Sequence, residues 1–231
     1  MRIFATAADV THEKSLLQFL RSLRIHHMSE RVICFDMGMT PSVRKQAAEL
    51  AEVRQWRFSP HWTDIVGRER FRAGAYAWKP QMITMVAMHE SPGELAWLDA
   101  GTFVNAPLMR AFEAARKHGI YSPASRGITG QWCHSGMLSK LRIAPWARIL
   151  GTPCRSAGAA FFDLRNPDVL SFVFEWLRLS LDPEIIAPPG CHPHHHRYDQ
   201  SLFNLLFASR GFLKPDTCNH CLDFAIQCDI D

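Results

Sequence analysis

The stretch Leu95-Ala96-Trp97-Leu98-Asp99-Ala100-Gly101-Thr102 decides the fold class. Its first four residues are continuously apolar, which is typical of a strand buried on both faces of a parallel sheet. Ligands of open α/β sheets bind in the crevice beyond the carboxyl ends of such strands. At that edge Asp99 can offer oxygens to a ribose hydroxyl or a hard divalent cation, and the small residues after it let a ligand approach the backbone. The alternative is that Asp99 only caps the next element or begins a turn.

Strands and helices alternate in the first part of the chain. The expected strands cover residues 2–8, 31–35, 52–58 and the run that ends at Asp99, and the expected helices cover 11–23, 40–50 and 80–89. Such alternation predicts an α/β fold, with helices packed on both faces of a mostly parallel sheet. Right-handed crossovers bring the ends of the first and fourth strands to one edge. We therefore expect Asp9 and Asp99 to face one crevice.

The second part of the chain is less regular. We expect helices at 106–118, from Asn166 onward and at 199–208, strands at 119–122 and 157–164, and a loop rich in Pro, Gly and His at 182–196. Because the sequence has no internal repeat and no domain-scale linker, we predict a single domain over residues 1–231. Residues 1–105 would form its nucleotide-binding half, and residues 106–231 its sugar and acceptor half.

Composition excludes several classes of function. The formal net charge is +4 and the basic residues are scattered, so nucleic-acid binding has no electrostatic footprint. No apolar run reaches the length of a membrane helix, and the N-terminus has no signal-peptide pattern, so we expect a cytoplasmic protein. The odd number of cysteines, seven, argues against a fully paired disulfide framework.

Several motifs occur in a fixed order along the chain. They are Phe4-Ala5-Thr6-Ala7-Ala8-Asp9, Tyr76-Ala77-Trp78-Lys79-Pro80, Trp97-Leu98-Asp99-Ala100-Gly101, the small-residue run Ser156-Ala157-Gly158-Ala159-Ala160-Phe161-Phe162, and His196-Arg197-Tyr198-Asp199-Gln200-Ser201-Leu202-Phe203-Asn204. Their order and spacing resemble the GT-A nucleotide-diphospho-sugar transferases, particularly the glycogenin-like branch. The resemblance covers residues 1 to about 210.

The resemblance implies a GT-A-like, Rossmann-like fold and transfer of a sugar from a nucleotide-diphospho-sugar to an acceptor. The donor would be a UDP-sugar, the acceptor a glycan, a protein or a small molecule, and the sugar configuration would be retained. The positions that match the motifs place Asp199 and Gln200 at the reacting carbon. The donor would be bound by Thr6, Asp9, Lys79, Asp99, Gly101 and Gly158.

The resemblance also implies a divalent cation, Mn²⁺ or Mg²⁺, bound by Asp99 and a C-terminal histidine, a role that His220 could fill. Gly101, however, stands where the family has its second metal-binding aspartate. We therefore expect the cation to bind weakly, or mainly together with the donor pyrophosphate. Lys79 would then neutralise more of the developing phosphate charge, with Arg70 and Arg72 as helpers unless they only form a solvated loop.

Other readings of these residues remain open. Asp9 and Asp199 could each serve only as a helix cap. Trp132 and His134 could shape a sugar pocket or belong to a structural loop. The cluster of Cys191, His192, His194, His195, His196, Cys218, His220 and Cys221 could bind structural zinc, form a disulfide or remain unligated. The whole protein could also be a GT-A-like nucleotide-binding protein without turnover, or a zinc-stabilised structural module.

Overall fold

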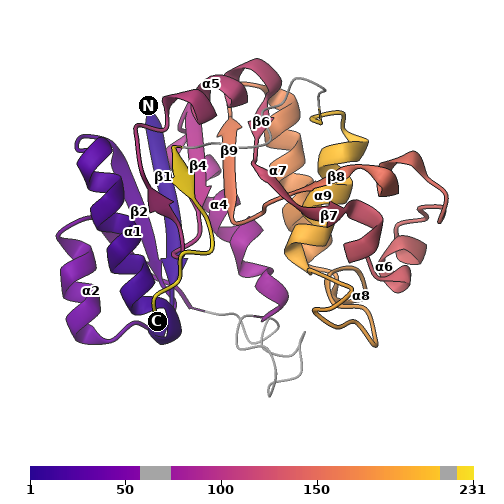
Figure 1. The fold of residues 1–231 in the computed structure, drawn as a ribbon, viewed down its shortest axis with the longest axis horizontal. Helices are drawn as coiled ribbons and strands as arrows, with labels where there is room; N and C mark the ends of the chain where they lie inside the picture. Colours follow the sequence, from indigo (N-terminus) through magenta and orange to yellow (C-terminus); the bar gives the residue numbers. More distant parts are fainter. Residues whose placement is uncertain (58–73, 214–222) are drawn as a thin grey trace.

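The computed structural model describes residues 1–57, 74–213 and 223–231. Its central sheet has the strand order β3-β2-β1-β4-β9-β6 (Figure 1). The strands are β1 (Arg2–Ala8), β2 (Arg31–Asp36), β3 (Glu52–Gln55), β4 (Glu94–Leu98), β6 (Ile120–Tyr121) and β9 (Ala159–Asp163). Strands β1 to β4 pair in parallel, and β9 is antiparallel to both β4 and β6. This is the mostly parallel, mixed sheet that the sequence predicts.

Both faces of the sheet are buried, which explains the continuous apolar runs. In β1, Ile3 and Ala5 join one apolar cluster while Phe4 and Ala8 join the other. Helices α4 (Trp78–Glu90), α7 (Pro167–Ser180) and α9 (Asp199–Ser209) supply residues to the first cluster. Helices α1 (Glu13–His26), α2 (Pro41–Ala48) and α5 (Met109–His118) supply residues to the second. The predicted packing of helices on both faces is thus confirmed.

Capping residues set the starts of two helices where the sequence predicts them. The Thr40 side chain accepts from the backbone of Val43 at the start of α2, and Asn166 accepts from Asp168 at the start of α7. A proline follows each cap, at a position where the missing N–H costs nothing. The sequence also predicts Thr11 as the cap of the first helix, and this is wrong: Asp9 caps a 3₁₀ turn (Val10–His12) that precedes α1, and α1 itself has no side-chain cap.

Some boundaries differ from the expectation. Strand β3 ends at Gln55, α2 at Ala48, and α5 begins at Met109. The expected loop at 182–196 contains the short helix α8 (Pro183–Ile186), because the side chain of Asp182 caps it. The remaining elements are α6 (Ser135–Lys140), the 3₁₀ turns at Gly74–Tyr76, Thr129–Trp132 and Arg148–Gly151, and the strands β5 (Phe103–Val104), β7 (Ala124–Ile128), β8 (Pro153–Arg155) and β10 (Phe224–Ala225).

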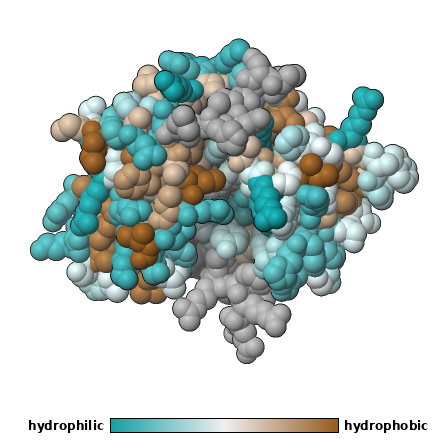
Figure 2. Space-filling view, viewed as in Figure 1, coloured by the Kyte–Doolittle hydropathy of each residue, from teal (hydrophilic) through white to brown (hydrophobic). Residues whose placement is uncertain are grey.

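The short strands pair outside the main sheet. Strand β7 pairs with β8, and β10 pairs antiparallel with β5. Through the β10–β5 pair, the C-terminal segment, yellow in Figure 1, lies beside the residues that follow β4. Apolar and hydrophilic residues are interspersed over the face that Figure 2 shows. No helix in the described part of the chain is both long and apolar enough to cross a membrane.

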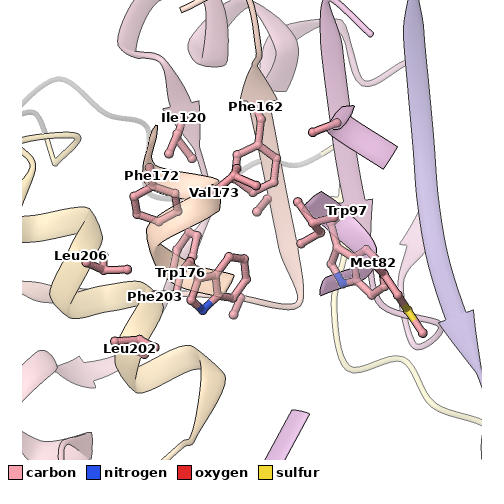
Figure 3. Packing of buried hydrophobic residues seen from close by; sticks show 14 of the residues in the cluster. Met82, Trp97, Ile120, Phe162, Phe172, Val173, Trp176, Leu202, Phe203 and Leu206 are labelled. Carbon is pink, nitrogen blue, oxygen red and sulfur yellow. The ribbon is translucent and has the colours of Figure 1, made fainter. Parts of the chain in front are cut away.

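Aromatic rings fill the space between α7 and α9 (Figure 3). The ring of Phe203 lies 5.4 Å from that of Phe172, edge to face, and 5.1 Å from that of Trp176. All three side chains are fully buried. This contact fixes α9, whose first residue is Asp199, against α7. Residues of both helices belong to the same apolar cluster as Phe162 of β9.

We expect Phe172→Ala to lower the free energy of unfolding by about 3–5 kcal/mol, because it removes a buried ring and leaves a cavity. Phe174→Ala, in the same helix at a side chain that is 43% exposed, is the matched control. It should change stability by about 0.5 kcal/mol or less. Denaturant unfolding of both variants measures the difference, and equal losses would contradict this packing.

Candidate functional site

Asp99 directly follows β4. Its backbone N–H donates to the carbonyl oxygen of Gly158 over 2.8 Å, which extends the β4–β9 pairing past the end of β4. Its Oδ1 accepts from the indole of Trp97 over 2.7 Å, and its Oδ2 accepts from Lys79 Nζ over 3.1 Å. The side chain is nevertheless 43% exposed. Buried donors therefore fix the orientation of a carboxylate that a ligand can still reach.

Lys79 lies in the first turn of α4, where the helix dipole disfavours a cation. It is only 4% exposed. Besides Asp99, its Nζ donates to the carbonyl oxygen of Ala157 over 3.4 Å and lies 3.4 Å from Oδ2 of Asp199. Burial by itself would lower the pKa of Lys79, but the Asp199 and Asp99 carboxylates outweigh it and raise that pKa. Lys79 is thus a cation held between two carboxylates from different elements.

Asp199 begins α9 and is 4% exposed. Burial is the main reason that its pKa is raised to about 6; Lys79 opposes this effect and Asp99 adds to it. The preceding residue, Tyr198, has φ 49° and ψ −117° and is buried. A conformation of this kind costs on the order of 1–3 kcal/mol in a non-glycine residue and persists only where its surroundings impose it. The backbone strain therefore lies directly beside the buried carboxylate.

Gln200 lies one residue further on, in a second polar group. Its Nε2 donates to Ser125 Oγ over 3.3 Å, and Arg197 donates to the same hydroxyl over 3.2 Å. The guanidinium of Arg197 lies 3.6 Å from the ring centroid of Trp132, a cation–π contact. The predicted pocket residue Trp132 is thus connected to the predicted catalytic residue Gln200 through Arg197 and Ser125.

The structure places Asp9 and Thr6 on β1 or just beyond it. Oδ1 of Asp9 accepts from the Thr11 backbone over 2.9 Å and from its hydroxyl over 2.6 Å, and lies 3.2 Å from Nδ1 of His12. Burial raises the pKa of Asp9, but these hydrogen bonds outweigh it and bring that pKa below its usual value. Thr6 is fully buried in the sheet, and its hydroxyl has no hydrogen-bond partner among the described residues. Asp9 therefore has the capping role that the sequence left open.

Two glycines leave room for carboxylates. A Cβ on Gly158 would lie 2.6 Å from Oδ2 of Asp99, closer than real Cβ atoms approach any atom. A Cβ on Gly101 would lie 2.5 Å from Oδ1 of Asp229, which belongs to the C-terminal segment. Both sequence-predicted glycines thus lie against an acidic side chain at the carboxyl edge of the sheet.

Two histidines of the predicted motifs, His134 and His196, have local structural contacts. His196 is fully buried, and its Nε2 lies 2.8 Å from the carbonyl oxygen of Ile186. Burial lowers the pKa of His196 to about 4, so the ring is neutral near pH 7. Nδ1 of His134 accepts from the backbone of Gly136 and caps α6. Within the described ranges, no group of three or more His, Cys, Asp or Glu side chains could hold a metal ion.

Some sequence-predicted residues fall outside the part of the chain that the structure describes. They are Arg70, Arg72, Cys218, His220 and Cys221. The zinc and disulfide alternatives, and the predicted metal ligand His220, therefore stay predictions.

Sequence reasoning missed three residues near the site. Tyr76 has φ 59°, and its ring centroid lies 5.9 Å from Nζ of Lys79. Arg197 and Asp229 were likewise not selected. Tyr76 and Arg197 had a usable signal, because each lies within one of the motifs named above. Asp229 had none in its own surroundings, since only folding brings it to Gly101.

The mixed sheet, with an acidic residue beyond β4 and a small-residue strand antiparallel to it, has the arrangement that the motifs predicted for a GT-A fold. Solved structures bear this out. The chain resembles galactosyltransferase LgtC in complex with donor and acceptor sugar analogs with a TM-score of 0.56 and 17% identity, over 90% of this chain and 70% of LgtC. It resembles mouse xyloside xylosyltransferase 1 with a TM-score of 0.53 and 13% identity, over 92% of this chain and 82% of that enzyme.

A mannosyltransferase from S. cerevisiae in complex with GDP is also similar, with a TM-score of 0.53 and 8% identity over 90% of this chain and 66% of that protein. No protein-family model and no curated protein matches the sequence. At such low identity the comparisons show the fold, and the GT-A fold that the motifs predicted is confirmed.

The buried ion pairs of Lys79 generate a pH-dependent prediction. Lys79→Met should lower the free energy of unfolding by about 3–5 kcal/mol near pH 7, because it leaves Asp199 buried without its cation. Without Lys79, the pKa of Asp199 in the folded variant rises further above its value in the unfolded chain. Protonation of Asp199 then stabilises the folded variant at low pH, and this stabilisation is lost as the pH rises. The loss should therefore shrink as the pH is lowered from 7 to 5.

The double variant Lys79→Met/Asp199→Asn serves as the control, because it removes both buried charges. It should be more stable than the single variant at pH 7. Urea unfolding at several pH values measures both effects. A loss that does not vary with pH, with no recovery in the double variant, would show that Lys79 acts through packing alone.

Proposed function

We propose that this protein is a glycosyltransferase, which moves a sugar from a UDP-sugar to an acceptor hydroxyl with retention of configuration. The observation that carries the proposal is the meeting of Lys79, Asp99 and Asp199 in a GT-A fold, at the carboxyl edge of the sheet. Ligands of open α/β sheets bind at that edge. The UDP moiety, the retention and the nature of the acceptor come from the motif resemblance. The assignment of residues 1–105 to the donor and 106–231 to the acceptor is part of the proposal.

The reaction breaks the bond between the sugar C1 and a phosphate oxygen, and the electron pair leaves with the nucleoside diphosphate. The acceptor oxygen bonds to C1 and gives up its proton to a basic oxygen, such as one on the departing phosphate. The centre passes through a cation-like state, which a nearby carboxylate or amide oxygen stabilises. We assign this role to Asp199 and Gln200, which are adjacent at the start of α9.

Lys79 holds the two carboxylates of the site in place. Its ammonium already has acceptors in Asp99 and Ala157 and an ion pair with Asp199, and it is almost fully buried. We propose that the positive charge of Lys79 also stabilises the phosphate leaving group. It would do so by electrostatic attraction over a distance, without direct hydrogen bonds to the phosphate.

The fold family implies a divalent cation, and the oxygens present suit one. Asp99 offers a half-exposed carboxylate, and hard cations such as Mg²⁺ and Mn²⁺ prefer oxygen ligands. When bound, the cation would neutralise charge on the donor pyrophosphate. The residues of the chain would contribute by orienting Asp99, through the indole of Trp97 and the ammonium of Lys79.

Donor binding is testable by thermal stability. UDP with Mn²⁺ at 100 times its dissociation constant should raise the free energy of unfolding by about 2.7 kcal/mol. Asp99→Asn should weaken this effect, because Asp99 loses charge at the proposed ligand site. Glu113→Gln, at a 63% exposed side chain on α5, should leave it unchanged. If no nucleoside diphosphate stabilises the protein at millimolar concentration with metal present, the proposed function is wrong.

Catalysis is tested separately from binding. Asp199→Asn and Gln200→Ala should reduce sugar transfer or donor hydrolysis far more than UDP affinity, because the proposed interaction forms mainly in the transition state. Asp182→Ala is the control, since Asp182 also lies at a helix start, where its side chain caps α8. It should cost about 1 kcal/mol of stability without loss of turnover. If Asp199→Asn lowers stability and keeps turnover, Asp199 has a structural role and not a catalytic one.

A further inference from the structure

The C-terminal segment fills a space that the sequence of the central motif leaves empty. A Cβ on Gly101 would lie 2.5 Å and 2.6 Å from the two carboxylate oxygens of Asp229 and 2.7 Å from its Cγ. A carbon–carbon bond spans about 1.5 Å, so an aspartate at position 101 would place its own carboxylate in this same region. The carboxylate of Asp229 thus occupies the volume that the side chain of an aspartate at 101 would need.

The backbone on both sides of Asp229 is fixed. The N–H of Cys228 donates to the carbonyl oxygen of Gly101 over 2.7 Å, and the carbonyl oxygen of Cys228 accepts from Gln18 over 3.1 Å. The N–H of Ile230 donates to Ser15 Oγ over 2.9 Å. The segment is therefore held against Gly101 by contacts that do not involve the Asp229 side chain.

Two further contacts bring the segment to this place. Strand β10 pairs with β5, which begins two residues after Gly101, and the carboxylate of Asp231 accepts from the backbone N–H groups of Lys14 and Ser15 at the start of α1. Figure 1 shows the segment running from β10 toward α1. No described residue donates a hydrogen bond to the Asp229 carboxylate or forms an ion pair with it, and Asp229 is exposed. The backbone of Asp229 is therefore held in place, while its carboxylate oxygens can still bind a ligand.

The charge balance of the described site calls for a cation. Asp99 and Asp199 share the ammonium of Lys79. The carboxylate of Asp229 lies against Gly101, two residues after Asp99, with no cation from the described residues. A donor pyrophosphate adds about two negative charges. Bringing such a group to an acidic site is unfavourable unless a divalent cation lies between them.

We propose that Asp229 replaces the aspartate that position 101 lacks, and acts with Asp99 as the second protein carboxylate for the divalent cation that accompanies the donor. The inference rests on the proposed function, because the donor pyrophosphate completes the oxygen ligands. Two carboxylates are too few for tight binding of a hard cation. The protein therefore binds the cation well only together with the nucleotide.

The test is Mn²⁺ binding, measured by calorimetry and by the electron paramagnetic resonance of free Mn²⁺, with and without UDP. The wild type should bind Mn²⁺ weakly alone and much more tightly with UDP. Asp229→Ala and Asp229→Asn should lower Mn²⁺ affinity in the presence of UDP at least about tenfold, as loss of a metal-site contact does. Glu113→Gln, remote on α5, should match the wild type.

The double variant Gly101→Asp/Asp229→Ala moves the carboxylate back into the central motif. It should recover most of the affinity lost in Asp229→Ala, because the carboxylate returns to the same space. Gly101→Asp alone should lower the melting temperature, since two carboxylates then compete for one volume. Circular dichroism confirms that each variant is folded.

The outcomes separate the inference from the proposed function. If the wild type binds UDP with Mn²⁺ and Asp229→Ala binds both equally well, the inference is wrong and the function stands. UDP binding to the wild type that is independent of Mn²⁺ also overturns the inference alone. If the wild type binds neither UDP nor GDP, with or without Mn²⁺, the proposed function and the inference fail together.

Discussion

The arrangement of the site depends on burying one ammonium group. A buried lysine costs several kcal/mol unless opposite charges and hydrogen bonds compensate for its lost hydration. Lys79 on α4 therefore requires Asp99, at the end of β4, and Asp199, at the start of α9, to come close to it. Helix α4 and strand β4 follow one another in the chain, whereas α9 lies far beyond them in the sequence. The need to neutralise one charge thus fixes the relative positions of the residues at the centre of the site.

The aromatic contacts between α7 and α9 also help to hold Asp199 near Lys79, because Asp199 is the first residue of α9. They press α9 against α7, so the carboxylate of Asp199 is held deep in the protein, where burial raises its pKa. The strained backbone at Tyr198 lies at the same junction. The packing of the aromatic rings stabilises the fold and offsets the destabilising effects of a buried acid and a positive φ. Strain of this kind persists where the surrounding contacts determine the backbone conformation.

Periodicity and capping residues predict the fold well because its long elements bury apolar residues in regular patterns. The runs at β1 and β4 and the Thr40-Pro41 and Asn166-Pro167 starts needed no tertiary information. The short pair β5–β10 escaped prediction, because two-residue strands carry no periodic signal and owe their formation to the surrounding structure. The motif likewise predicted a role for Asp99 but not for Asp229, because Asp229 comes close to the motif only in the folded chain. Gly101 marked a missing carboxylate, yet only the folded chain reveals what lies in its place.

The pairing of β10 with β5 has a consequence for the order in which the protein can fold during synthesis. The central sheet consists of strands that lie between β1 and β9 in the chain, and the chain leaves the ribosome N-terminus first. The edge beyond β4, however, acquires its last neighbour only when residues 224–229 emerge and dock. A nascent chain can therefore form most of its hydrophobic core while the surface around Gly101 is still open. The pairing that completes the site is thus distinct from the pairings that build the central sheet.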